Sequence, residues 1–145
     1  MENKENKIIV IIPVRNESKL LGPTLDALKK QTLVLHRIIV INDGSTDDTS
    51  SIAKKFNVEV VDLKDRGFQA TGKPVLANVI NKGLEKILEN DCQYVMILGA
   101  DHILPPNYIS KIAVEMDQNN LLVIASGVIK GEAQEILLLE VPAEL

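Results

Sequence analysis

An apolar run rich in β-branched residues leads into a polar turn and then into a helical pattern. The run is Ile38-Ile39-Val40-Ile41, the turn is Asn42-Asp43-Gly44-Ser45, and the helical pattern begins near Thr46. A run that is apolar at every position is typical of a parallel strand covered on both faces. Such a strand places the residue after it at the ligand-binding edge of an open α/β sheet. The sequence therefore predicts a buried parallel strand that presents Asp43 at that edge.

The same alternation of strand and helix patterns continues along the chain. Strands alternating with helices indicate βαβ units with right-handed crossovers. We expect one α/β domain over residues 1–145, with a doubly wound, mostly parallel sheet and helices on both faces. The segment 132–140 fits either a helix or an edge strand. Strands are predicted at 7–12, 37–42, 58–63, 94–98 and 121–125. Helices are predicted at 18–31, 74–89 and 107–117, and one more is predicted to begin near Thr46 with Ser45 as its N-cap.

Composition limits the classes of function. The formal net charge is −4, which argues against nucleic acid as a partner. The one cysteine, Cys92, cannot form an internal disulfide, and we expect it to fill space at the start of a buried strand. No apolar run approaches the roughly 20 residues that span a bilayer, and the polar start does not resemble a signal peptide. We expect a cytoplasmic protein, with the cytoplasmic face of a membrane as the alternative location.

Polar residues follow three of the predicted strands. Arg15-Asn16-Glu17 follow the first strand, Asp43 the second and Asp101-His102 the fourth. In the common strand order 3-2-1-4 these strands are neighbours, and ligands bind where the order reverses. Carboxylates there can accept hydrogen bonds from a base or ribose and can hold Mg²⁺ or Mn²⁺ against phosphate oxygens. The crevice therefore suits a nucleoside diphosphate, whose remaining charge could be neutralised by Arg15, Arg66 or Lys73.

Each of these residues also has a structural interpretation. Asp43 and Ser45 could equally have only the structural roles of a turn residue and a helix cap. Glu17 could simply favour a helix N-terminus. Asp101 fits ordinary loop chemistry, and a lone histidine such as His102 is more often structural than a ligand. The sequence contains no glycine fingerprint of the dinucleotide-binding or P-loop type, which argues against both of those classes.

Several stretches together resemble family 2 glycosyltransferases of the Rossmann-like GT-A fold. The first two are Ile11-Ile12-Pro13-Val14-Arg15-Asn16-Glu17 and Val40-Ile41-Asn42-Asp43-Gly44-Ser45-Thr46-Asp47-Asp48-Thr49, and their combination is highly specific. The likeness continues through Gly72-Lys73-Pro74 and Asn81-Lys82-Gly83-Leu84 to Tyr94-Val95-Met96-Ile97-Leu98-Gly99-Ala100-Asp101, and covers most of residues 8–127.

The resemblance implies a metal-dependent, inverting transfer from a nucleotide-sugar donor. It implies a divalent cation, Mg²⁺ or Mn²⁺, held by Asp101 of the family's Asp-x-Asp motif. Gly99 replaces the first aspartate of that motif, which removes a ribose or metal contact, and His102 is a candidate substitute ligand. The implied nucleotide-binding residues are Pro13, Val14, Arg15, Asn16, Glu17, Asp43, Gly44, Ser45 and Lys73.

In this family the acceptor site and the catalytic base follow the portion seen here. Aromatic residues, which often form ligand-binding surfaces, make up only 3% of the chain. We therefore expect a donor-binding domain that lacks the C-terminal acceptor half, with an unassigned catalytic base. The acceptor could be a saccharide, a lipid or a protein.

Two other functions are weighed against the glycosyltransferase. A non-catalytic nucleotide-binding or interaction module of the same fold is favoured by Gly99 and by the short chain. A transferase that makes nucleotide sugars fits less well, because residues 13–17 contain no glycine. Independently of these, the apolar stretch Ile136–Leu139 predicts a contact between copies of the chain.

Overall fold

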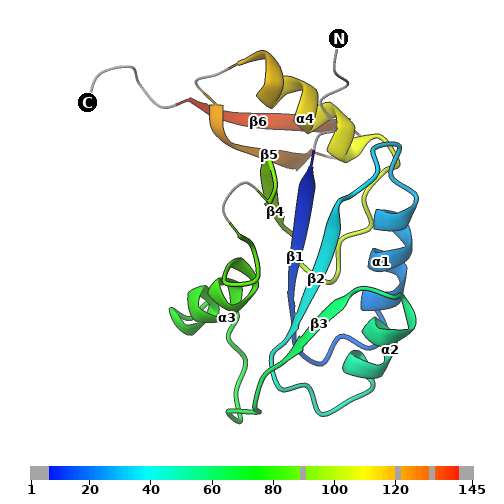
Figure 1. Cartoon of the computed structure of the whole chain (residues 1–145), viewed down its shortest axis with the longest axis vertical. Coiled ribbons are helices and arrows are strands. Elements are labelled where there is room, and N and C mark those ends of the chain that lie inside the picture. The colour runs from blue at the N-terminus through cyan, green and yellow to red at the C-terminus, as the bar shows by residue number, and fades with distance from the viewer. Residues whose placement is uncertain (1–6, 89–90, 120–121, 131–132, 141–145) are drawn as a thin grey trace.

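The computed structural model describes residues 7–88, 91–119, 122–130 and 133–140. A parallel sheet with helices on both faces forms the main body, and a hairpin lies beyond one end of it (Figure 1). The strands of this sheet are β1 (Ile8–Val14), β2 (Arg37–Asn42), β3 (Glu59–Asp62) and β4 (Tyr94–Ile97). Their order is β3-β2-β1-β4, as predicted, and all three pairings are parallel. This confirms the predicted α/β class.

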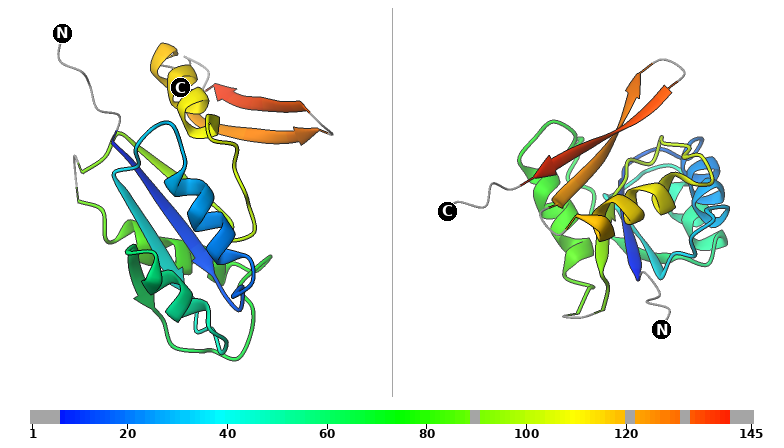
Figure 2. Two further views of the ribbon diagram at one scale, coloured as in Figure 1. Left: turned by 90° about the vertical axis from the view of Figure 1, so that its right-hand side faces the viewer. Right: turned by 90° about the horizontal axis from the view of Figure 1, so that it is seen from above.

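Helices cover the two faces of this sheet. Two views show α1 (Leu21–Lys29) and α2 (Thr49–Lys55) on one face and α3 (Val75–Leu84) on the other (Figures 1 and 2). The fourth helix, α4 (Tyr108–Gln118), precedes the hairpin. Within the part of the chain that the structure describes, no helix has the length and apolarity needed to cross a membrane.

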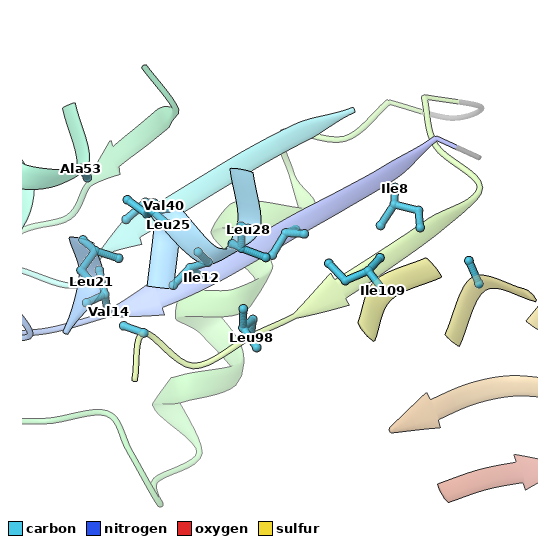
Figure 3. Close-up of a cluster of buried hydrophobic side chains, with 13 residues drawn as sticks. Ile8, Ile12, Val14, Leu21, Leu25, Leu28, Val40, Ala53, Leu98 and Ile109 are labelled. Atoms are coloured by element: carbon cyan, nitrogen blue, oxygen red, sulfur yellow. The ribbon is translucent and has the colours of Figure 1, made fainter. Parts of the chain in front are cut away.

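Alternate residues of β1 contribute to two separate cores, because successive side chains of a strand point to opposite faces. On one face Ile8, Val10, Ile12 and Val14 pack with α1 residues such as Leu25 (Figure 3). On the other face Ile9 and Ile11 pack with β2 and with Val79 of α3. Cys92 is half-buried against this second core, just before β4. The fully apolar character of β1 is therefore a consequence of burial on both faces.

The strand predicted at 121–125 forms from Leu122 onward, but it does not join the parallel sheet. Instead, β5 (Leu122–Lys130) pairs antiparallel with β6 (Ala133–Glu140) in a separate sheet of two strands. Only two residues connect them, which permits a hairpin, whereas a parallel return needs a long crossover. The ambiguous segment 132–140 is therefore a strand over its described part. The structure describes the backbone of β6 but not its side chains. The predicted contact between copies through Ile136–Leu139 therefore stays a prediction.

Several predicted boundaries also change. The first helix begins at Leu21 rather than 18, which places Pro23 in its first turn, where the missing N–H does no harm. The second begins at Thr49 rather than near Thr46, and the third ends at Leu84 rather than 89. Ser45 is not the N-cap of α2, since Asp48 holds that position, and the Ser45 hydroxyl instead accepts a hydrogen bond from the Asn16 N–H.

A carboxylate at the end of β3 joins β2, β3 and α2. Asp62 accepts hydrogen bonds from Asn42 Nδ2 at 2.7 Å, Ser50 Oγ at 2.7 Å and Lys54 Nζ at 2.8 Å. These donors, with Asn42 first, lower the pKa of Asp62 from 3.8 to about 2. Asp62 thereby holds the end of β3 against the end of β2, next to Asp43.

Replacing Asp62 with asparagine should lower the free energy of unfolding near neutral pH by about 1 kcal/mol. The figure is small because this side chain is 44% exposed. Since folding depresses the pKa of Asp62, its contribution is present above about pH 4 and is lost as the pH falls toward about 2. Urea unfolding at about pH 7 and about pH 2.5 measures the difference. An equal effect at both pH values would contradict this role for Asp62.

Candidate functional site

A cleft of about 370 Å³ opens at the carboxyl ends of β1, β2 and β4. Six of the predicted site residues line it: Pro13, Val14, Arg15, Glu17, Asp43 and Asp101. A groove of about 430 Å³ lies at the opposite end of β2, beside His36 and Arg37. The guanidinium of Arg37 is already paired there with Glu59 and Asp91. We place the site in the first cleft, because α/β sheets bind ligands at the carboxyl ends of their strands.

Asp43 is the most buried polar residue of the cleft, with 2% of its surface exposed. Its backbone N–H donates to the Val14 carbonyl at 2.8 Å, which joins the ends of β1 and β2. Its Oδ2 is paired with Arg66, whereas its buried Oδ1 has no partner among the described residues. The buried Nε of Arg66 likewise has none. A buried unpaired donor and acceptor are unfavourable, so this pair is suited to a ligand that supplies both partners.

Arg15 organises the loop that carries Asp43. Its guanidinium donates to the Asp43 carbonyl at 2.5 Å, to the Gly44 carbonyl at 3.1 Å and to Asp65 Oδ1 at 2.5 Å. The hydrogen bond from Arg15 is the main cause that lowers the pKa of Asp65. These hydrogen bonds hold the loop that carries Asp43, and the Arg15 charge is paired with Asp65.

Asn16 and Ser45 connect the two loops that border the cleft without lining it. The backbone N–H of Asn16 donates to Ser45 Oγ at 2.9 Å, and Asn16 Oδ1 accepts from the Thr46 N–H at 2.8 Å. Asn16 has a left-handed backbone with φ of 53°, a conformation that asparagine tolerates better than most residues. The N–H of Glu17 donates to Thr49 Oγ1 at 3.0 Å in the same way. These hydrogen bonds fix the position of Glu17 beside Asp43.

The loop between β3 and α3, residues 63–74, supplies a wall of the cleft that sequence reasoning missed. Gln69, Ala70 and Thr71 line the cleft. Lys73 does not line it, since its Nζ lies over the Phe68 ring, 4.6 Å from the centroid. The Arg66 guanidinium lies 5.3 Å from the same centroid. This loop has no helical or strand periodicity from which its position could be predicted. Only its charged residues, Arg66 and Lys73, indicated from the sequence that it could take part in the site.

The end of β4 brings Asp101 to the cleft. Thr24 of α1 donates to the Ala100 carbonyl at 2.7 Å and anchors this turn. The side chains of Asp101 and His102 contact each other, with 2.8 Å between Oδ1 and Nδ1. Among the described residues, no three His, Cys, Asp or Glu side chains are grouped to hold a metal ion. The Asp101 carboxylate by itself is the kind of ligand that suits a cation taking its other ligands from phosphates and water, as Mg²⁺ commonly does.

Comparisons with known proteins agree with this architecture. Staphylococcus aureus TarS 1–349 in complex with UDP-GlcNAc superposes with a TM-score of 0.64 at 23% identity, covering 79% of this chain and 32% of that one. A mannosyltransferase from Pyrobaculum calidifontis, in complex with GDP-Man and Mn²⁺, superposes with a TM-score of 0.65 at 23% identity. The superposition covers 86% of this chain and 35% of the mannosyltransferase. The fold is therefore that of GT-A glycosyltransferases.

The family follows from the sequence match. The model of glycosyl transferase family 2 matches residues 9–136, so the chain belongs to this family. A 4,4'-diaponeurosporenoate glycosyltransferase of Staphylococcus aureus (strain USA300) is 41% identical over 58 residues, which are 40% of this chain and 15% of that protein. The chain thus spans about a third of the length of each of the two solved structures. Its match to the curated Staphylococcus aureus relative covers 15% of that protein's length.

Proposed function

We propose that this chain binds the nucleotide-sugar donor of an inverting glycosyltransferase reaction, in the cleft at the ends of β1, β2 and β4. The unpartnered Oδ1 of the buried Asp43 carries the proposal, because it is a hydrogen-bond acceptor that no described residue satisfies. A base or ribose donor group would satisfy that oxygen. The ligands named for the two structural relatives, UDP-GlcNAc and GDP-Man, support this class of donor.

The lining residues divide naturally between the two ends of such a donor. Pro13, Glu17 and Asp43 lie together and are proposed to contact the base and ribose. Asp101 is proposed to face the diphosphate, with the exposed Lys73 available from the β3–α3 loop. Val14, Arg15, Asn16, Gly44 and Ser45 act by holding these residues in place.

A bound Mg²⁺ or Mn²⁺ would stabilise the negative charge of the departing diphosphate. This chain's own residues orient the donor and keep water from Asp43. Transfer requires an acceptor hydroxyl and a base that removes its proton, and we assign neither. Saccharide, lipid and protein acceptors all stay open, and a cytoplasmic location, free or at the membrane face, belongs to the proposal.

Isothermal titration calorimetry of the 145-residue chain with UDP and GDP tests this proposal. We expect binding of at least one nucleotide, with higher affinity in Mn²⁺ than in EDTA. Hydrolysis or transfer of a nucleotide sugar would identify an enzyme. Binding without turnover would favour a non-catalytic module of the same fold, for which Gly99 is the main argument. Absence of binding by either nucleotide would refute the proposed site.

Replacing Asp101 with asparagine should reduce the nucleotide affinity measured in Mn²⁺ by about tenfold. The affinity in EDTA should not change, because Asp101 is proposed to act through the cation. Asp26→Asn is the matched control, since Asp26 is an exposed aspartate of α1 paired with Lys30 and outside the cleft. An equal loss for Asp101→Asn with and without the cation would contradict its assignment as a metal ligand.

A further inference from the structure

Two buried polar side chains interrupt the apolar face of α1. Thr24 is fully buried within the helix, and Gln31, two residues beyond the end of the helix, is 8% exposed. The other buried positions of this face include Leu25 and Leu28. A buried polar side chain needs hydrogen-bond partners, whereas an apolar one of the same size does not. Both Thr24 and Gln31 find such partners in one segment, 100–109, which leaves the end of β4 and leads into α4.

The partners of these side chains lie on either side of the residues 101–104. Thr24 Oγ1 donates to the Ala100 carbonyl at 2.7 Å, just before them. Gln31 Nε2 donates to the Pro105 carbonyl at 2.8 Å, just after them. The segment 101–104, which contains the cleft residue Asp101, is therefore attached to α1 and its C-terminal extension at both of its ends.

Further hydrogen bonds fix the far end of this segment at the start of α4. Gln31 Oε1 accepts from the Ile109 N–H at 3.1 Å, in the first turn of α4, where no helical carbonyl is available to that donor. Gln31 Nε2 also donates to the Ala27 carbonyl of α1 at 3.3 Å, which fixes the orientation of the amide. The next residue, Thr32, donates its N–H to the Pro106 carbonyl at 2.7 Å. The amide of Gln31 thus connects α1 directly with α4.

The opposite end of α1 is joined to another wall of the cleft. The N–H groups of Leu20 and Leu21 donate to the Glu17 carbonyl at 3.1 Å and 3.0 Å, so Glu17 forms the turn that leads into α1. Glu17 and Asp101 both line the cleft. One helix therefore holds the loops that carry these two carboxylates, one loop at its start and the other along its buried face.

We infer that Thr24 and Gln31 are positioning residues of the donor site, which set the distance between Glu17 and Asp101. The inference rests on the proposed function, in which Glu17 contacts the base and ribose and Asp101 faces the diphosphate. A fixed spacing between these carboxylates matches a ligand of one length, because both of its ends must be engaged together. The chain thereby selects a nucleoside diphosphate over the corresponding monophosphate.

The test compares the affinities for UDP and UMP, and for GDP and GMP, by calorimetry in MnCl₂. We expect the wild-type chain to bind a diphosphate more tightly than its monophosphate. Thr24→Val keeps the shape of the side chain but leaves the buried Ala100 carbonyl without its donor. The affinity for the diphosphate should fall about tenfold, while that for the monophosphate stays unchanged. Gln31→Met should have the same effect. Thr24→Ser, which keeps the hydroxyl, should retain both wild-type affinities.

Thr49→Val is the matched comparison at the other end of the cleft. Thr49 is also fully buried, but its Oγ1 accepts from the Glu17 N–H at 3.0 Å. Its replacement should weaken the binding of monophosphate and diphosphate by the same factor. The ratio of the two affinities therefore distinguishes a displaced Asp101 from a general loosening of the fold. Urea unfolding shows which variants are folded under the conditions of the calorimetry, and Gln31→Met decides the matter if Thr24→Val is unfolded.

Equal losses for monophosphate and diphosphate in the decisive variant, or no loss for either, would overturn the inference and leave the proposed nucleotide site intact. Wild-type affinities that do not differ between diphosphate and monophosphate would overturn it as well. Failure of all four nucleotides to bind the wild-type chain would instead refute the proposed function, and the inference with it.

Discussion

Replacing Asp43 with asparagine is expected to weaken the binding of UDP or GDP by about 100-fold and to lower the free energy of unfolding by about 2 kcal/mol. The binding loss arises because the amide of asparagine should turn its oxygen toward the donor Arg66, which places an NH2 donor where the unpartnered Oδ1 is the acceptor proposed for the ligand. The stability loss arises because Arg66, with 22% of its side chain exposed, would keep a partly buried charge without its partner. Calorimetry and urea unfolding measure the two effects.

A double variant separates these two effects. Asp43→Asn combined with Arg66→Gln replaces the ion pair with two neutral amides, so much of the lost stability should return. Nucleotide binding should not return, because the carboxylate is still absent. If the double variant recovered both stability and binding, Asp43 would be a structural partner of Arg66 and not a nucleotide ligand.

The place of Asp43 could be predicted from sequence because it depends on a local pattern. A fully apolar run identifies a buried parallel strand, and the residue after such a strand lies at the ligand edge of the sheet. The same reasoning placed Glu17 and Asp101 at this edge, and all three line one cleft. Strand order followed from general rules of α/β topology, and the structure confirms it.

The functions of Arg15 and Ser45 could not be predicted in this way. Their partners lie far away in the sequence: Arg15 binds Asp65, and Ser45 accepts from Asn16. No local pattern encodes such contacts, since they depend on how the loops meet in space. The pairing of β5 with β6 could not be predicted for a similar reason, because an apolar run predicts a strand but does not identify the neighbour that it pairs with.

Replacing Gly44 with alanine is expected to lower the free energy of unfolding by about 3–5 kcal/mol. Gly44 has φ of +64°, and a Cβ there would lie 2.4 Å from the Asp65 Cα and 2.6 Å from the Asp65 nitrogen. These are backbone atoms, which cannot turn aside as a flexible side chain can. Arg15 binds both Gly44 and Asp65, so the variant should also move the β3–α3 loop and weaken nucleotide binding. Urea unfolding and calorimetry measure the two losses.

Gly72 is the control that isolates the effect of this close approach. It has a similar left-handed backbone, with φ of +72°, but nothing lies within 4 Å of its Cβ position. Gly72→Ala should therefore cost only the backbone strain of about 1–2 kcal/mol. The excess loss in Gly44→Ala then measures the contact between Gly44 and Asp65, which sets how the loop carrying Arg66 meets Asp43. Equal losses in the two variants would show that this contact relaxes freely, and that the backbone at residue 65 does not position Arg66.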